Sequence, residues 1–240
     1  MSRIEVARIL EAALKRVSGR EDLASMIDAT ILSPTATESD VERLVEEAAN
    51  EGYACVVTTP LHVVSVARRA EGLGVNLCSV VGFPLGSHPL EAKLAEARAA
   101  LEAGASELDL VPALWRGVGY VEEEVKAVVE VAREAGARVK VIVEAQLWDD
   151  ERLRGLVEAA ARAGAWMVKT STGVYTKGGD PYTVSRLYRV AEPYGLHVKA
   201  SGGIRTGLDA LLAVGAGASR VGTSTPGKVL ATLSLGGPGL

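Results

Sequence analysis

Apolar runs alternate with polar, alanine-rich segments along almost the whole chain. A strand that is covered on both faces is apolar at nearly every position, so these runs are typical of buried parallel strands. The segments between them carry apolar residues at helical spacing, as in Val121, Val125, Val128 and Ala132. The predicted strands are Ile27–Leu32, Ala54–Thr59, Asn76–Phe83, Glu107–Val111, Val139–Glu144, Trp166–Thr170, Val198–Ser201 and Arg220–Thr223.

The ends of the intervening helices are also marked in the sequence. Thr37–Asp40 and Thr206–Asp209 have the spacing of a capping box, and Pro181 suits a first helical turn. Glycine ends each polar segment, where it takes the left-handed conformation without steric cost. These glycines are Gly52, Gly74, Gly104, Gly136, Gly164, Gly195 and Gly217.

The repeated strand–helix unit predicts an α/β fold, a (β/α)8 TIM barrel formed as a single domain by residues 1–240. An additional N-terminal helix, about Ile4–Val17 within residues 1–20, is expected to close the barrel bottom or to pack on a partner subunit. Residues 233–240 are expected to form a flexible tail. The alternative is a doubly wound open sheet, but Asp28–Pro34 after the first strand has no glycine for a dinucleotide-binding turn.

Composition excludes several classes of protein. The net charge of −4 argues against nucleic-acid binding, and no run of eighteen apolar residues predicts a membrane span. The first residues lack the apolar region of a signal peptide, so a cytoplasmic location is expected. Cys55 and Cys78 lie in apolar runs and are predicted to be buried free thiols. The histidines and cysteines are scattered, which predicts no metal site.

Six charged residues lie beyond the first position of a predicted strand, where an ionised side chain must be paired or neutralised. Lys140 lies near the start of its strand, and we expect it either to form an ion pair at the barrel floor or to extend its ammonium group to solvent there. Glu144 ends its strand and either belongs to a site or holds a structural lysine. The others are Asp28, Asp109, Lys169 and Lys199.

Lys169 and Lys199 occupy matching places on successive strands, in Val168–Gly173 and Val198–Arg205. If both point inward, mutual repulsion and burial keep one amine neutral, and a neutral amine attacks a carbonyl. The alternative is that Asp109 or Glu144 neutralises each lysine. Two lysines in register beside a strand aspartate favour amine chemistry.

Two acids accompany these lysines. Asp109 is either a general acid/base or a counter-ion that orients a lysine. Asp28 has the same two interpretations, of which we prefer the structural one.

Glycine-rich loops follow the last strands. Ser201–Thr206 and Gly222–Gly227 each open a helix, and exposed backbone N–H groups at the last two loops of a barrel commonly bind phosphate. Arg205 adds a positive charge, and Thr172–Gly173 and Lys177–Gly179 complete a candidate cradle. The loop Val81–His88, which contains the single phenylalanine, Phe83, is expected only to form a turn or to cap a helix.

Taken in order, six segments resemble the signature segments of the deoxyribose-phosphate aldolase family, and the resemblance runs from about residue 25 to 230. They are Ile27–Leu32, Val80–Gly86, Glu107–Val111, Val168–Gly173, Val198–Arg205 and Gly222–Ser224.

This resemblance implies a class I aldolase without metal or cofactor, active in carbohydrate and nucleoside catabolism. It would reversibly cleave 2-deoxy-D-ribose 5-phosphate to acetaldehyde and D-glyceraldehyde 3-phosphate. Lys169 would form the Schiff base, Lys199 would depress its pKa, Asp109 would act with water as acid/base, and Asp28 would hydrogen-bond in the lysine network. Substrate and phosphate would be bound by Thr170, Thr172, Gly173, Gly202, Gly203, Arg205, Gly222 and Ser224.

The chain departs from the family pattern at a few places. Ala29 and Ser33 stand where histidine and lysine are common, and Val174 stands where some members have a basic residue that Lys177 would replace. The expected partners are a small sugar phosphate and further copies of the chain, as a dimer or tetramer. Two alternatives stay open: a lysine-dependent barrel aldolase for a longer sugar phosphate, and a non-catalytic barrel that binds sugar phosphates.

Overall fold

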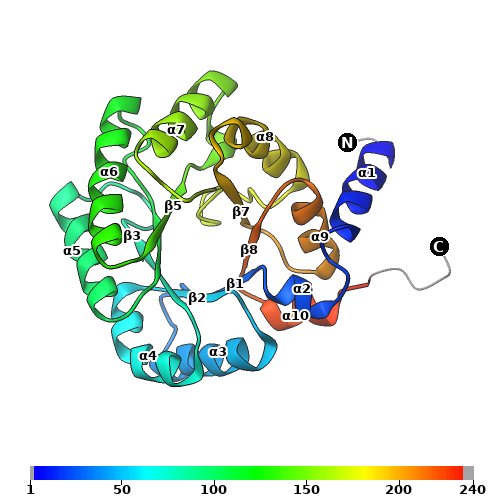
Figure 1. The fold of residues 1–240 in the computed structure, drawn as a ribbon, viewed down its shortest axis with the longest axis horizontal. Coiled ribbons are helices and arrows are strands. Elements are labelled where there is room, and N and C mark those ends of the chain that lie inside the picture. Colours follow the sequence, from blue (N-terminus) through cyan, green and yellow to red (C-terminus); the bar gives the residue numbers. More distant parts are fainter. Residues whose placement is uncertain (1–2, 235–240) are drawn as a thin grey trace.

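Eight parallel strands close a barrel, in which each strand pairs with the next and β8 pairs with β1 (Figure 1). The structure is a computed structural model that describes residues 3–234. The predicted (β/α)8 barrel is thereby confirmed. The strands are β1 (Ile27–Thr30), β2 (Cys55–Thr58), β3 (Leu77–Val81), β4 (Glu107–Leu110), β5 (Arg138–Ile142), β6 (Met167–Lys169), β7 (His197–Ser201) and β8 (Arg220–Thr223).

Helices surround the barrel, most of them in an outer ring (Figure 1). They are α1 (Arg3–Leu14), α2 (Arg20–Ala24), α3 (Glu38–Glu51), α4 (Pro60–Leu73), α5 (Leu90–Glu102), α6 (Val118–Glu134), α7 (Asp150–Arg162), α8 (Pro181–Ala191), α9 (Gly207–Gly215) and α10 (Pro226–Ala231), with short 3-10 turns η1 (Ala145–Leu147) and η2 (Glu192–Tyr194). None of the helices within residues 3–234 is long and apolar enough to cross a membrane.

The helix ends follow the local chemistry read from the sequence. Thr37 and Thr206 each form the reciprocal capping box with the aspartate three residues later. Pro181 opens α8, and all seven helix-ending glycines have positive φ angles. The predicted face of α6 is buried against the strands, and each fully buried valine there stabilises the fold by about 1.5–3 kcal/mol.

The structure corrects the expected strand lengths. β1 ends at Thr30 and β3 at Val81, short of the predicted Leu32 and Phe83. In both cases the apolar run continues beyond the strand into a loop at the C-terminal face of the barrel. Apolar side chains can be buried there without pairing of the backbone to a neighbouring strand. The short helix α2 and the turn η1 had no counterpart in the prediction.

The N-terminal helix lies outside the ring, against α9, so it does not close the barrel bottom (Figure 1). A Cβ on Gly215 would lie 1.9 Å from the carbonyl oxygen of Ile9, so this close packing of α1 on α9 requires glycine. Leu233 packs against the start of α9 at Gly207. Residues 235–240 of the predicted flexible tail lie outside the described residues.

Strand register determines which charged residues meet. Lys169 on β6 is the register partner of Lys199 on β7, and Asp109 on β4 is the partner of Lys140 on β5. All four are buried. Because the barrel is closed, side chains that point inward from different strands share one interior, and the charged residues are concentrated there.

Candidate active site

A cluster of charged residues occupies the barrel interior, and each of these residues is at most 9% exposed. It contains three carboxylates and four basic groups. An unbalanced buried charge is costly, so this composition favours one neutral base within the cluster. The members are Asp28, Glu107, Asp109, Lys140, Lys169, Lys199 and Arg220.

Asp109 lies at the centre of this cluster. Lys169 Nζ and Lys199 Nζ both donate to its Oδ2, at 2.8 and 2.6 Å, and Lys140 Nζ donates to Oδ1 at 3.0 Å. Burial raises the pKa of Asp109, but Lys140, Lys169 and Lys199 lower it by more, so that it lies well below its usual value. Asp109 is therefore a carboxylate at neutral pH.

The two lysines that share Asp109 Oδ2 have pKa values shifted in opposite directions. Burial lowers the pKa of Lys169, the charge of Lys199 lowers it further, and Asp109 offsets only part of this. Lys199 has a second carboxylate, Asp28 Oδ2, at 2.5 Å. Burial lowers the pKa of Lys199 too, but Asp109 and Asp28 raise it by more. Lys169 is therefore the amine more easily held neutral, and Lys199 stays an ammonium ion.

Asp28 links this lysine pair to the last strand. Its Oδ1 accepts from Nε of Arg220 at 2.6 Å, while its Oδ2 faces Lys199. Burial raises the pKa of Asp28, but Lys199, Lys140 and Arg220 lower it by more. These contacts are those of a structural member of the lysine network, the role expected for Asp28.

Lys140 forms the ion pair expected for it, with Glu107 Oε2 at 2.5 Å. The structure adds that Lys140 also contacts Asp109 and approaches Asp28 within 3.7 Å. Burial lowers the pKa of Lys140, but Asp109 and the other acids raise it well above its usual value. Lys140 is thus part of the same charged cluster as the two lysines of β6 and β7.

Both cysteines are buried free thiols, as predicted, but they are not scattered. The Sγ atoms of Cys55 and Cys78 and a carboxylate oxygen of Glu107 lie within 4.8 Å of one another, a donor set that zinc accepts. Arg220 donates to Cys55 Sγ at 3.2 Å, and Lys140 is 2.5 Å from Glu107. These positive groups repel a cation, and burial raises the pKa of the Cys55 thiol. The surroundings therefore oppose metal binding.

A cavity of about 370 Å³ opens at the C-terminal ends of β1, β6, β7 and β8. Gly202 and Gly203 have φ angles of 95° and 86°, a backbone shape that side chains disfavour. Gly222 joins the cavity to the charged cluster, because a Cβ there would lie 3.2 Å from Lys199 Cε. Seven of the residues predicted to bind substrate line the cavity: Thr172, Gly173, Gly202, Gly203, Arg205, Gly222 and Ser224.

Three residues differ from their expected places. Phe83, expected only to shape its loop, lines the cavity. Thr170, expected to touch substrate, is fully buried and exchanges hydrogen bonds with the backbone of Ser201, at 3.1 and 2.9 Å, so it fastens β6 to β7. Of the two alternatives for Glu144, the contacts do not support the one in which it holds a structural lysine, since its carboxylate accepts from the Thr172 N–H and from Thr176 Oγ1.

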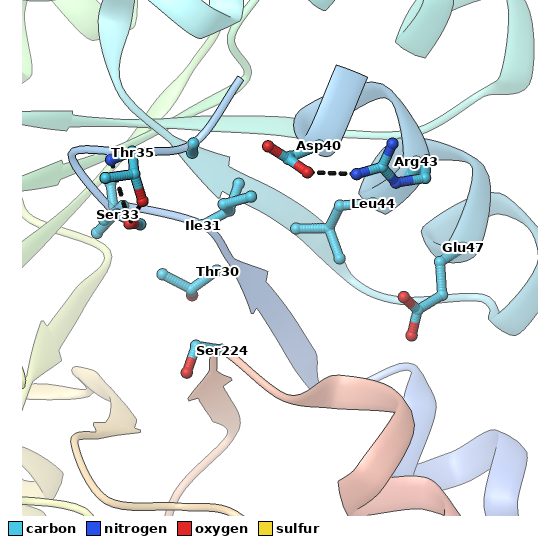
Figure 2. Close-up of a pocket in the computed structure, with 11 residues that line it drawn as sticks. Thr30, Ile31, Ser33, Thr35, Asp40, Arg43, Leu44, Glu47 and Ser224 are labelled. Carbon is cyan, nitrogen blue, oxygen red and sulfur yellow. Dashed lines mark hydrogen bonds and ion pairs between the residues drawn. The ribbon is translucent and has the colours of Figure 1, made fainter. Parts of the chain in front are cut away.

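A second pocket of about 490 Å³ adjoins this cavity, between the loop after β1 and helix α3 (Figure 2). The two share Thr30, Leu32, Ser33 and Ser224. In the second pocket Arg43 points toward Asp40 and forms an ion pair with it, and Glu47 adds another carboxylate (Figure 2). An anion therefore fits the glycine loops beside Arg205 better than it fits this acidic neighbour.

Comparison with known proteins matches this geometry to a family. A family model described as DeoC/LacD family aldolase matches residues 23–224. A deoxyribose-phosphate aldolase of Aeropyrum pernix is 60% identical over 222 residues, which cover 92% of this chain and 94% of that protein. One from Thermococcus kodakarensis is 41% identical over 218 residues, covering 88% and 96%.

Solved structures give the same result. The structure described as a unique tetrameric deoxyribose phosphate aldolase from Aeropyrum pernix superposes with a TM-score of 0.93 at 59% identity, covering 94% of this chain and 96% of that one. A structure from Burkholderia cenocepacia that is described as a phosphonomutase, at 16% identity and a TM-score of 0.58, shares the fold alone.

Proposed function

Because this chain belongs to the DeoC/LacD family of aldolases, we propose that it is a lyase that reversibly cleaves 2-deoxy-D-ribose 5-phosphate to acetaldehyde and D-glyceraldehyde 3-phosphate. The observation that carries this proposal is the pair of buried amines on one carboxylate oxygen, Lys169 and Lys199 on Asp109 Oδ2. This arrangement supplies a neutral amine without a metal ion.

Lys169 is the nucleophile of the proposed reaction. Its lowered pKa keeps a fraction of the amine free to attack the substrate carbonyl. The resulting protonated imine withdraws electrons, so the C2–C3 bond breaks as the C3 hydroxyl group loses its proton. This step releases D-glyceraldehyde 3-phosphate and leaves an enamine in place of an unassisted carbanion. Protonation of the enamine at C2 and hydrolysis of the imine release acetaldehyde and restore Lys169.

Lys199 and Asp28 serve this amine indirectly. Lys199 keeps its proton because Asp28 and Asp109 both face it, and its positive charge disfavours a second ammonium ion on Lys169. Asp28, in contact with Lys199 and Arg220, holds the ammonium group in place. Lys199 is the electrostatic partner of the Schiff-base lysine.

Asp109 is the proposed acid/base group, acting with water. Its carboxylate touches the nitrogen of Lys169, where protons are gained and lost as the carbinolamine forms and dehydrates. Its low pKa makes it an acceptor in the resting enzyme. A direct contact with both lysines also lets it pass a proton between them.

The substrate phosphate binds in the 370 Å³ cavity, on the loops after β6, β7 and β8. Gly173, Gly202, Gly203 and Ser224 offer a backbone without bulky side chains, and Arg205 supplies the positive charge. The stem of Lys177 lies over Gly203, so its ammonium group is a second cation available to the phosphate. Binding energy from the phosphate, away from the reacting carbons, positions the carbonyl at Lys169.

We also propose that the chain assembles as a homotetramer, since the Aeropyrum pernix relative is described as tetrameric and matches over nearly the whole chain. We further propose a cytoplasmic location, because the charged substrate does not cross a membrane unaided.

The test is an assay with purified protein that couples D-glyceraldehyde 3-phosphate release to a dehydrogenase. Turnover of 2-deoxy-D-ribose 5-phosphate above that of fructose or heptose phosphates at equal concentration is the expected result. A preference for a longer sugar phosphate would instead support the alternative aldolase, and no turnover of any sugar phosphate would support the non-catalytic barrel.

A further inference from the structure

Glu144 has a backbone conformation that distinguishes it from its neighbours. Its φ of 45° makes it the single non-glycine residue with positive φ among residues 3–234. Glutamate pays an energetic cost for this left-handed conformation, and such outliers persist where the surrounding structure requires them. The residue is 3% exposed, so the carboxylate is also largely removed from bulk water.

The hydrogen bonds on either side explain this conformation. Val143 N donates to the carbonyl oxygen of Lys169 at 3.0 Å, and Ala145 N donates to that of Thr170 at 2.8 Å. Between these two hydrogen bonds, the segment after β5 therefore contains one residue more than the segment after β6. Glu144 is the extra residue of a bulge, and a bulge redirects the side chain that it carries.

The redirected carboxylate contacts the loop that follows β6. It accepts a hydrogen bond from the backbone N–H of Thr172 and another from Thr176 Oγ1 at 2.8 Å. Thr172 and Gly173 line the cavity in which the phosphate is proposed to bind. The Glu144 carboxylate thus connects the two ends of the loop 172–176 on the buried side of this loop. The other side of the loop faces the cavity.

The same loop packs closely on the loop after β7. A Cβ on Gly202 would lie 2.6 Å from Ser171 Oγ and 3.1 Å from Thr176 O. Gly179 N donates to the Gly202 carbonyl at 2.9 Å. A shift of the segment 172–176 would therefore displace Gly202 and Gly203, the turn proposed to hold the phosphate.

We propose that Glu144 is a positioning residue for phosphate recognition, which sets the shape of the loops after β6 and β7 without touching the substrate. This inference rests on the proposed function. We expect Glu144 to affect binding of the phosphate group and not the chemistry at Lys169, because its carboxylate is bound to the loop after β6 and forms no ion pair with the charged cluster.

The experiment measures steady-state kinetics of the full-length Glu144→Gln variant with 2-deoxy-D-ribose 5-phosphate and with unphosphorylated 2-deoxy-D-ribose. A charged acceptor is replaced by a neutral amide of the same shape. The expected result is a KM about tenfold to a hundredfold higher for the phosphorylated sugar. We expect kcat within about threefold of wild type and a much smaller change for the sugar without phosphate.

Two further variants make the test specific. Thr176→Val removes one partner of Glu144 in an exposed loop, and we expect it to raise the same KM by about threefold to tenfold. Glu151→Gln, the same change at an exposed site on α7, should leave all constants unchanged. Borohydride trapping of acetaldehyde on Lys169, which needs no phosphate, should proceed at the wild-type rate in Glu144→Gln.

An unchanged KM in both Glu144→Gln and Thr176→Val would overturn the inference. So would equal losses with the phosphorylated and unphosphorylated sugars, which would show general damage to the fold. Should Glu144→Gln fail to fold, the Thr176→Val result decides the question. If the wild-type protein showed no activity in the same measurements, the result would instead contradict the proposed function.

Discussion

Lys169 and Lys199 are register partners on β6 and β7, and yet the interior of the barrel shifts their pKa values in opposite directions. The difference arises from their carboxylates. Asp109 Oδ2 is shared by both amines, whereas Asp28 Oδ2 lies 2.5 Å from Lys199 and forms no ion pair with Lys169. The second carboxylate keeps the proton on Lys199, and Lys169 is left as the amine proposed to act as the nucleophile.

The Schiff base is therefore expected on Lys169. Incubation with acetaldehyde and borohydride, followed by peptide mass mapping, should show a reduced adduct on the peptide that contains Lys169 and none on Lys199. Lys169→Ala should reduce kcat below about one thousandth of wild type, because no other neutral amine replaces it. An adduct on Lys199 would reverse the two assigned roles.

Removal of the second amine should shift the pH profile. In Lys199→Leu the positive charge that lowers the pKa of Lys169 is lost, and Lys169 no longer shares Asp109 Oδ2 with a second lysine, so the pKa of Lys169 rises. Residual activity should then need a higher pH, and the acid limb of kcat/KM should move to the alkaline side. Lys199→Arg retains the charge and should move this limb less, whereas identical profiles in wild type and Lys199→Leu would refute the electrostatic role.

Arg205 should contribute to binding of the phosphate. Arg205→Gln removes the positive charge beside the glycine loops and should raise KM for 2-deoxy-D-ribose 5-phosphate by about tenfold, with little effect on kcat. Inhibition by inorganic phosphate should weaken in parallel. Arg43→Gln is the matched control, because Arg43 lies in the neighbouring pocket and is already paired with Asp40. Equal effects of the two substitutions would argue against the assigned phosphate site.

Metal removal should leave the reaction unchanged. The donors Cys55, Cys78 and Glu107 come close together, but Lys140 and Arg220 already contact them. Prolonged dialysis against a chelator, followed by the coupled assay and elemental analysis, should give wild-type activity with less than one equivalent of any metal. Loss of activity that zinc restores would contradict this prediction.

A buried ion pair supports the loops after β3 and β4. Lys93 Nζ donates to Glu124 Oε1 and to the Gly86 carbonyl, at 2.7 and 2.8 Å, while Glu124 Oε2 accepts from Ala113 N at 2.7 Å. Lys93→Met leaves a buried carboxylate unpaired and should lower the free energy of unfolding by about 3–5 kcal/mol in urea titration. Adding Glu124→Leu should recover part of this loss, and a double variant no more stable than the single one would indicate that the backbone contacts dominate.

The fold was readable from the sequence because its signals are local and repeated. Each helix start or end that was predicted depends on a few adjacent residues, such as Thr206 and Asp209, and each strand on one apolar run. The position of α1 was not readable in the same way. It depends on contact between Ile9 and Gly215, which are far apart in the chain, and no local pattern specifies that contact.

The candidate site was readable only in part, for a related reason. The lysines and Asp109 stood out as charges within apolar strands, whereas Glu107 and Arg220 begin their strands and were not considered as members of the interior. Glu107 lies two residues before Asp109, on the same face of β4, and this spacing was the available signal. The grouping of Cys55 with Cys78 depends on how β2 and β3 pair, which a single sequence does not give.

The contact between Asp28 and Arg220 connects the first strand of the ring to the last, across 192 positions of the chain. A nascent polypeptide that has not yet reached β8 lacks this guanidinium group, and its β1 and β7 have no strand to join them. The charged cluster around Lys169 is therefore complete only after β8 has been synthesised. We expect the lowered pKa of Lys169, and with it the proposed reaction with aldehydes, to appear only when the whole ring has formed.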